Sequence, residues 1–317
     1  MGDLSRPDIR PEEKPKKVRK RPYIPNLAAA RFKPTEDWST DQARQRYEDA
    51  RFPFEVDKIL YEDCVEGMRC LPAGSIDVVV ADPPFGLSFT GKESIYNRDD
   101  RFVRSGYREV QGEYEEFSVR WIGELPRIVK SSGSIWIFSG WTHLRAILNA
   151  TAKAGLLLVN DIIWRYPFGV FTERKFVTSH YHVLFLAKGR DYYFNKVMHY
   201  PLDVWAINRT YRPGEVKNST KLPEKVVMRC IDFTTRPGGL VFDPFMGNGT
   251  TAVVAKGSYR HYLGFEINRN MKEVIDANLA SLGLGQFYVP YSERKEELVM
   301  RARRRYGVHS RRSRLTP

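Results

Sequence analysis

The chain has 317 residues, of which 42% are hydrophobic and 13% aromatic, as expected of a globular protein with one substantial core. It contains no apolar stretch of the roughly eighteen residues that a membrane-spanning helix needs. Its three cysteines show neither a metal-binding nor a disulfide-type spacing. We therefore expect a soluble, cytoplasmic protein without a membrane partner and without a metal site.

The net charge of +13 is concentrated at the two ends of the chain. Residues 1–22 carry a net charge of +4 and residues 291–317 a net charge of +6, so the body is nearly balanced. Basic tails favour a polyanionic partner, because lysine and arginine contact phosphates without reading sequence. A disordered, solvated tail is the alternative for each end. The run at 14–21 also resembles a nuclear import signal, which would matter only in a eukaryotic host.

Regular secondary structure is expected between residues 56 and 290, after an N-terminal arm at 23–55 with one short helix at 40–50. Apolar, β-branched runs predict strands at 56–61, 76–81, 133–139, 156–166, 181–188, 240–245 and 261–267. The remaining periodic segments predict helices at 115–130, 141–154, 222–233, 250–256 and 268–282. Strands that alternate with helices indicate an α/β fold with a mostly parallel sheet.

Two long segments without periodicity interrupt this pattern, at 86–114 and 190–220. Loops of that length inside a compact domain are usually functional. Both segments interleave basic and aromatic residues, and in the first of them this suits phosphate contact and base wedging. For the first segment, the alternative is a solvated lid that only covers a cofactor. The candidates for nucleic-acid contact are Lys92, Arg98, Arg101, Arg104, Arg209 and Arg212.

A glycine turn between a strand and a helix marks a candidate nucleotide site. Gly247 and Gly249 follow the strand at 240–245, where glycine lets the backbone approach a ligand closely. Glu266 ends the next strand at the separation at which an acidic residue meets ribose hydroxyls. Ala252 replaces the third glycine of a dinucleotide fingerprint, which favours a nucleoside ligand over NAD. A plain tight turn beside a surface glutamate is the alternative.

A second polar tip, Asp82-Pro83-Pro84-Phe85, follows the buried strand at 76–81. Ligands of open α/β sheets bind beyond the carboxyl ends of the strands, so both tips should border one crevice. Asp82 and the Pro83 carbonyl offer two acceptors for the hydrogens of an amino group. The two prolines stiffen the strand exit, and Phe85 offers a face on which a flat base can stack. A structural turn is the alternative for this tetrapeptide taken alone.

The two tips together resemble motifs of the amino-group DNA methyltransferases, over about residues 56–282. The segment 243–251 resembles their S-adenosylmethionine loop, and 82–85 resembles their catalytic tetrapeptide, in which Asp, Asn or Ser precedes Pro-Pro and Tyr or Phe. The catalytic motif comes first, as in the permuted β group, whose recognition segment lies between the two motifs. The resemblance implies a Rossmann-like sheet, mostly parallel with an antiparallel edge hairpin strand, that binds S-adenosylmethionine.

The resemblance also implies roles for single residues. The catalytic residues would be Asp82, Pro83, Pro84 and Phe85. The cofactor loop would contribute Asp243, Pro244, Phe245, Gly247, Asn248, Gly249, Thr250 and Thr251, with Glu266 on the next strand. Asp63 is similar to the acidic residue that contacts the adenine of the cofactor. Lys221 is similar to the lysine before the helix that closes over the cofactor, although Leu222 separates it from Pro223 where the family usually has Lys-Pro.

The implied reaction is methyl transfer to the exocyclic amine of a base flipped out of double-stranded DNA. Aspartate at position 82 favours adenine N6 in this family, and cytosine N4 is the alternative. Methylation of RNA or of a protein amide is disfavoured by Asp82 and by the motif order. A catalytically silent nucleic-acid-binding subunit is disfavoured because both tips are intact. The implied partners are double-stranded DNA and, in a restriction–modification pair, a cognate restriction endonuclease, with a nucleoid-associated location and an oligomeric state left open.

Overall fold

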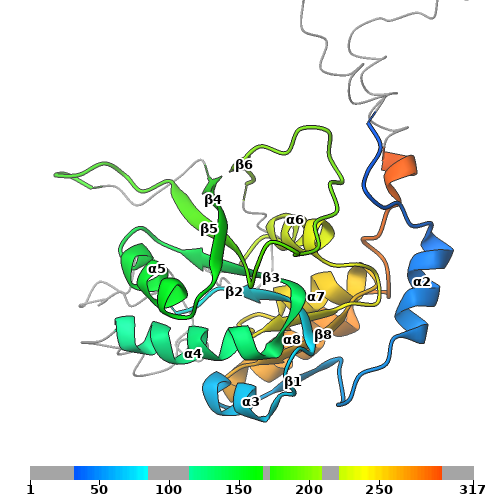
Figure 1. Ribbon diagram of the computed structural model, residues 1–317, viewed down its shortest axis with the longest axis horizontal. Helices are drawn as coiled ribbons and strands as arrows, with labels where there is room; N and C mark the ends of the chain where they lie inside the picture. The colour runs from blue at the N-terminus through cyan, green and yellow to red at the C-terminus, as the bar shows by residue number, and fades with distance from the viewer. Residues whose placement is uncertain (1–31, 85–113, 167–171, 209–220, 295–317) are drawn as a thin grey trace, which may run out of the picture.

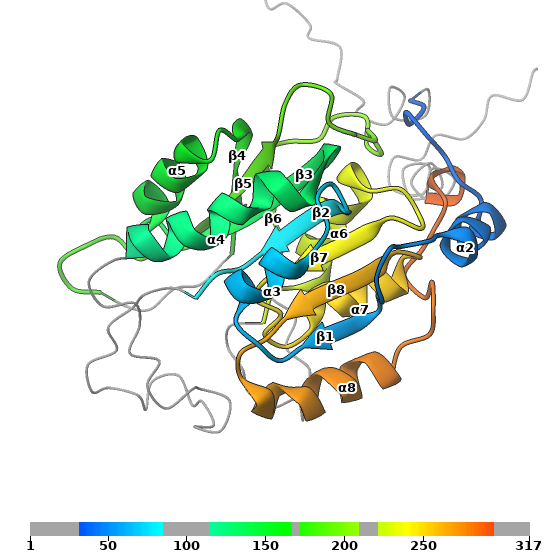
Figure 2. The same ribbon diagram turned by 60° about the horizontal axis from the view of Figure 1, so that its bottom comes forward.

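One mixed sheet of eight strands forms the centre of the described structure, and helices cover both of its faces (Figures 1 and 2). The computed structural model describes residues 32–84, 114–166, 172–208 and 221–294. In sheet order the strands are β1 (Lys58–Leu60), β8 (His261–Phe265), β7 (Leu240–Asp243), β2 (Ile76–Ala81), β3 (Val129–Ser139), β5 (His180–Ala187), β4 (Leu157–Arg165) and β6 (Val204–Ala206). The helices are α2 (Thr40–Asp49), α3 (Cys64–Cys70), α4 (Tyr114–Ile128), α5 (Leu144–Lys153), α6 (Glu224–Thr234), α7 (Thr250–Gly257), α8 (Lys272–Ala280) and the short 3-10 helix η2 (Arg269–Met271).

The strand directions confirm the fold class expected from the sequence. Parallel pairing joins β1, β8, β7, β2 and β3 in turn, and it also joins β4 to β6. Among the described strands only β5 is reversed, since it runs antiparallel to both β3 and β4. The expected hairpin is therefore β4–β5. The outer strand β6 was not predicted, because its three residues are too few to show an alternating pattern.

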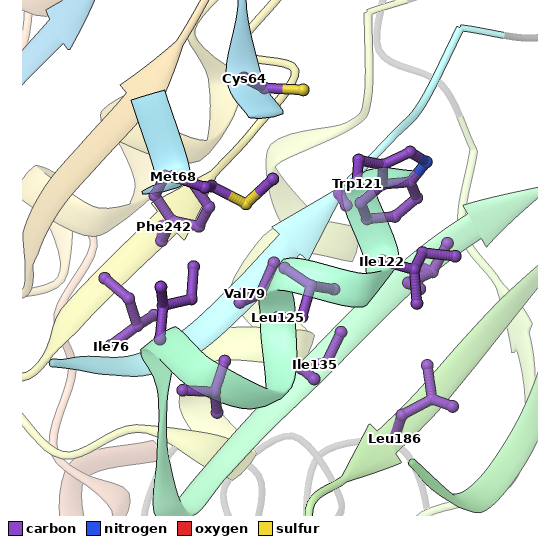
Figure 3. Close-up of a cluster of buried hydrophobic side chains, with 14 of the residues drawn as sticks. Cys64, Met68, Ile76, Val79, Trp121, Ile122, Leu125, Ile135, Leu186 and Phe242 are labelled. Carbon is purple, nitrogen blue, oxygen red and sulfur yellow. The ribbon is translucent and has the colours of Figure 1, made fainter. Parts of the chain in front are cut away.

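Two apolar layers hold the helices against the sheet. Side chains alternate along a strand, so Val79 of β2 faces one layer while Val78 and Val80 face the other. On the side of Val79, Trp121 and Leu125 of α4 are fully buried over the central strands (Figure 3). Truncation of such a side chain typically costs about 2–5 kcal/mol. The ends of the central strands are therefore firmly positioned.

The parallel strands β1, β8, β7, β2 and β3 all end at one edge of the sheet, here called the carboxyl edge. Because β2 is hydrogen-bonded to β7, the segments that begin at Asp82 and at Pro244 leave the sheet side by side. Because β7 is hydrogen-bonded to β8, Glu266 follows immediately on the other side. The topology thus brings the two sequence motifs to one place, as the sequence predicted.

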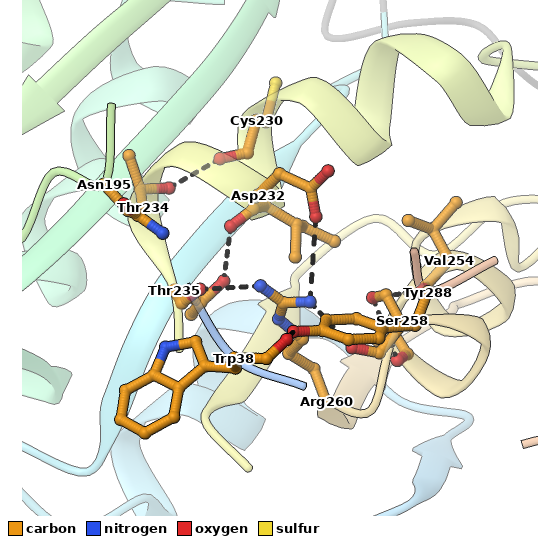
Figure 4. A network of polar contacts seen from close by, with 12 residues as sticks. Trp38, Asn195, Cys230, Asp232, Thr234, Thr235, Val254, Ser258, Arg260 and Tyr288 are labelled. Carbon is orange, nitrogen blue, oxygen red and sulfur yellow. Dashed lines mark hydrogen bonds and ion pairs between the residues drawn. The ribbon is translucent and has the colours of Figure 1, made fainter. Parts of the chain in front are cut away.

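A buried polar network lies at the opposite edge of the sheet, where the parallel strands β7 and β8 begin (Figure 4). The guanidinium of Arg260 is buried, donates to two backbone carbonyl oxygens at 2.7 and 2.8 Å, and lies 3.7 Å from the carboxylate of Asp232. Burial lowers the pKa of Arg260, and the nearby Asp232 opposes that change. Arg294 binds the other oxygen of Asp232 at 3.1 Å. This cluster ties α6, the residue before β8 and the C-terminal segment together.

The N-terminal arm contacts the C-terminal segment outside the sheet. The hydroxyl of Tyr288 donates to the backbone carbonyl of Trp38 at 2.8 Å. The rings of Phe32 and Tyr291 meet edge to face, with their centroids 5.5 Å apart. Tyr291 belongs to the segment that the sequence assigned to a basic tail, and it packs against the N-terminal arm. The first and last described residues of the chain therefore lie at the same corner (Figure 1).

Candidate active site

The turn after β7 is shaped by two glycines with left-handed backbone angles. Gly247 has φ +54° and Gly249, the N-cap of α7, has φ +78°. A Cβ atom on Gly249 would lie 3.0 Å from a side-chain carbon of Ile275 in α8, so both conformation and space favour glycine there. At Gly247 the added Cβ would meet nothing nearer than 3.8 Å, so the backbone angle is what favours glycine at this position.

Glu266 holds this turn against the end of β8. Its Oε2 accepts the N–H of Gly247 at 2.8 Å, and its Oε1 accepts the N–H of Asn268 at 2.7 Å. Burial raises the pKa of Glu266, and these N–H donors oppose the rise. Each carboxylate oxygen has a second lone pair, so the group can still accept hydrogen bonds from a pair of vicinal hydroxyls.

The predicted cofactor-loop residues fall into two groups. Phe245, Gly247 and Asn248 are partly accessible. The others are buried beneath the loop: Asp243, Pro244, Gly249, Thr250 and Thr251. The carboxylate of Asp243 accepts the N–H of Phe245 at 2.8 Å. Asp243 thus braces the loop backbone from below, while the accessible residues form its surface.

Burial raises the pKa of Asp243 to about 7 from its ordinary value of 3.8, although hydrogen bonds from Thr251 and from Phe245 oppose the shift. In the unfolded chain an aspartate loses its proton near pH 4, about three units lower. Between those two values the folded protein binds more protons than the unfolded chain. The free energy of unfolding therefore falls as the pH rises from about 4 to about 7.

Asp243→Asn should remove this pH-dependent contribution, because the amide is isosteric and carries no charge. We expect the variant to gain about 2–4 kcal/mol of unfolding free energy relative to the wild type at pH 8, at about 1.4 kcal/mol per pKa unit. The gain should shrink as the pH is lowered toward 4. Urea titrations of both proteins across this range measure the difference. Parallel stability profiles for the two proteins would contradict the assignment.

Two residues that the sequence did not single out flank Glu266. Ile267 follows it directly and is 51% exposed, and Tyr61 follows β1 on the neighbouring strand. Burial raises the pKa of the Tyr61 hydroxyl, with a further contribution from the negative charge of Asp276. An exposed aliphatic side chain beside an anchored carboxylate suits the flat face and the diol of a nucleoside. For Ile267, the only signal in the sequence was its position immediately after Glu266.

The two remaining predicted cofactor residues lie on either side of this region. Asp63 is the N-cap of α3, where its Oδ1 accepts the N–H groups of Val65 at 2.9 Å and Glu66 at 3.3 Å. Lys221 stands three residues before α6. Because α6 leads into the start of β7, its own N-terminus lies toward the carboxyl edge.

The segment that begins at Asp82 leaves the sheet between the turn after β7 and the end of β3. Asp82 is half-buried, with its Oδ1 atom shielded from solvent, and Pro83 is buried behind it. Several predicted site residues lie outside the described residues: Phe85, Lys92, Arg98, Arg101, Arg104, Arg209 and Arg212. Within the described ranges, no group of three or more His, Cys, Asp or Glu side chains suits a metal ion, and no helix is long and apolar enough to cross a membrane.

The sequence profile of the DNA methylase family matches residues 76–277, which is more than half of the chain and includes both motifs. The chain belongs to the DNA methylase family. The type II methyltransferase M.HinfI of Haemophilus influenzae is 28% identical to this methylase over 257 residues, covering 72% of this chain and 69% of the relative. The DNA adenine methyltransferase YhdJ of Escherichia coli K12 is 27% identical over 302 residues, covering 85% of this chain and 95% of the relative.

A solved structure agrees with this methylase in fold. The cytosine-N4-specific PvuII DNA methyltransferase matches with a TM-score of 0.58 at 16% identity, covering 80% of this chain and 96% of that chain. Family membership defines the reaction class. The protein is an S-adenosylmethionine-dependent DNA methyltransferase that acts on an exocyclic amino group, adenine N6 or cytosine N4.

Proposed function

We propose that this methyltransferase methylates the N6 amino group of adenine in double-stranded DNA. The observation that carries the proposal is the aspartate at position 82, at the end of a central strand and beside the cofactor loop. One relative that matches most of the chain is named a DNA adenine methyltransferase. Cytosine N4 is the second candidate, because the same pair of acceptors can serve either amino group.

The residues at the carboxyl edge suit S-adenosylmethionine. Glu266 is anchored by two backbone N–H groups, which aligns its free lone pairs for ribose hydroxyls. Ile267 offers an apolar face for the adenine, and Gly247 and Asn248 form an accessible loop surface over the buried residues. We assign the contact with the adenine edge to Asp63 and closure over the site to Lys221. When bound, the cofactor supplies a methyl group made electrophilic by its sulfonium.

Asp82 and Pro83 are assigned to the amino group of the target. The carboxylate of Asp82 accepts one amino hydrogen and the Pro83 carbonyl accepts the other, which turns the nitrogen lone pair toward the methyl group. With the cofactor bound, the nitrogen would take its methyl group as the sulfonium leaves as a thioether, and the carboxylate of Asp82 would accept the surplus proton. Positioning supplies most of the rate enhancement, since an in-line displacement needs little else. Pro84 stiffens the segment, and Phe85 is proposed to stack on the flipped base.

Product analysis distinguishes the two target bases. Duplex DNA is incubated with the protein and S-adenosylmethionine, digested to nucleosides and analysed by mass spectrometry, with a reaction lacking cofactor as the control. We expect N6-methyladenine. N4-methylcytosine would overturn the base assignment and keep the reaction class, and an unmodified digest would overturn the activity.

Partners beyond DNA follow from the same proposal. We propose contacts between the basic residues at 86–114 and 190–220 and the DNA, and an enzyme located with the chromosome. A cognate restriction endonuclease is proposed because one relative is a type II methyltransferase. A host extract that contains such a nuclease should cut unmodified DNA and spare DNA that this enzyme has methylated.

A further inference from the structure

One aromatic side chain on the described part of the connection between β4 and β5 is almost fully exposed. Phe176 is 99% exposed, more than any other large hydrophobic side chain among the described residues. A phenylalanine in this state contributes nothing to the core, and burying it elsewhere would be favourable by about 1.5–3 kcal/mol. Single exposed hydrophobic residues are common on protein surfaces, so the location of Phe176 decides whether it has a function.

The connection overhangs the carboxyl edge. In β5, His182 lies opposite Ser139, the last residue of β3. The hairpin continues beyond that point, because Arg165 still pairs with His180 and the N–H of Tyr166 donates to Ser179 at 3.0 Å. The strand register therefore carries the connection past the end of β3. Figures 1 and 2 both show the described part of the connection, residues 172–179, projecting from the body on the side where β2 ends.

The β4–β5 connection lies on the side of Asp82 that faces away from the cofactor loop. The cofactor loop and Glu266 lie on β7 and β8, to one side of β2, whereas β3, β5 and β4 lie to the other. A base that reaches Asp82 must enter from the side that the cofactor leaves open. Trp141, two residues after β3 and 56% exposed, is a second accessible aromatic residue on this side.

The tip of the connection is a closed, basic turn. The hydroxyl of Thr172 donates to the carbonyl of Lys175 at 2.5 Å, which closes the turn. Arg174 and Lys175 are exposed next to Phe176. In the part of the chain that the structure describes, neither forms a salt bridge. Glu173 is exposed in the same turn, so the two cations leave it with a net charge of +1. An exposed aromatic ring beside a turn of net positive charge suits a stacked polyanion, in which bases alternate with phosphates.

We propose that the turn at 172–177 enters the target duplex, with Phe176 filling the space that the flipped base leaves and Arg174 and Lys175 binding the adjacent phosphates. Apolar side chains can insert between base steps in this way, and flipping a base costs a few kcal/mol that such a side chain offsets. The inference rests on the proposed function, and it adds a DNA-positioning element outside the segments at 86–114 and 190–220.

The test compares Phe176→Ala with the wild type on two substrates. One is a fully matched duplex. The other carries an abasic site opposite the target base, so the target base has no pairing partner and is easier to flip out. We expect the variant to lose about 10- to 100-fold in kcat/KM on the matched duplex, the range that loss of one stacking contact gives. On the abasic substrate the loss should fall to less than about threefold. Leu284→Ala, which truncates an exposed side chain away from this edge, should match the wild type on both.

The basic pair is tested through salt dependence. Arg174→Ala combined with Lys175→Ala should reduce the slope of log Kd against log salt by about 1–2 units, since each lost phosphate contact removes about 0.9. Equal activity of Phe176→Ala and the wild type on the matched duplex would overturn the proposal that Phe176 enters the duplex. An equal loss on both substrates would also overturn it, because stacking on the flipped base itself predicts that result. If the wild type methylates neither substrate, the proposed function is what fails.

Discussion

Replacing Asp82 with alanine should slow methyl transfer by orders of magnitude while the protein still folds and binds S-adenosylmethionine. The side chain is half-buried at the exit of β2, where it contributes an acceptor and not apolar packing. Without that acceptor the amino lone pair stays delocalised in the base, and no group receives the proton. We expect the single-turnover rate to fall by about 10²–10⁴-fold, the usual effect of removing a proton acceptor or an electrostatic contact at the reacting atom.

Single-turnover transfer of a labelled methyl group to duplex DNA measures this loss, and calorimetry measures cofactor affinity. Asp82→Asn is the matched control, because its amide oxygen still accepts one hydrogen but cannot take the proton. Its rate should lie between those of the wild type and the alanine variant. Normal turnover by Asp82→Ala would remove Asp82 from the mechanism.

Replacing Glu266 with alanine should weaken S-adenosylmethionine binding by about 100-fold or more. The carboxylate fixes the Gly247 turn through a 2.8 Å hydrogen bond, and in the proposed site it also accepts hydrogen bonds from the ribose. Hydrogen bonds to a charged group contribute about 1.5–3 kcal/mol each, and 1.4 kcal/mol corresponds to a tenfold change in affinity. Loss of the ribose contacts therefore gives the expected factor.

Isothermal titration with S-adenosylmethionine measures the effect directly. Glu266→Gln should lose less affinity, because its amide oxygen can replace one carboxylate oxygen. Glu273→Ala removes an exposed carboxylate from α8, in the same region, and should bind as the wild type does. Unchanged affinity in Glu266→Ala would show that the ribose lies elsewhere.

The main strands could be predicted because each carries enough apolar residues to show a pattern. Ile76 to Ala81 matches its predicted strand at both ends, since this strand is buried on both faces. The helix expected at 115–130 ends at Ile128, because Val129 pairs with Ile76 and starts β3. Tertiary pairing decided that boundary. The sequence also lacked a signal for α3, a short helix that depends on Asp63 as its cap.

The candidate site was predictable as far as it depends on order along the chain. Strand ends, glycine spacing and the position of Glu266 follow from the sequence, and parallel pairing then brings them together. Which residues are accessible could not be predicted. The burial of Asp243 depends on how α7 packs over β7, and the exposure of Phe176 depends on the β4–β5 register. Both are consequences of contacts between distant segments.

The meeting of Phe32 with Tyr291 has a consequence for the connectivity of the fold. Since the ends of the folded body are neighbours, a short linker could join them without disturbing the sheet. The chain could then be opened between β6 and α6, in a connection that contains neither of the two tips. In the resulting circular permutant, the half with the cofactor loop (α6 to α8) would precede the half with Asp82 (α2 to β6) along the chain, and every strand would keep its present place in the sheet. The order of the two halves along the polypeptide is therefore a matter of where the ring is cut.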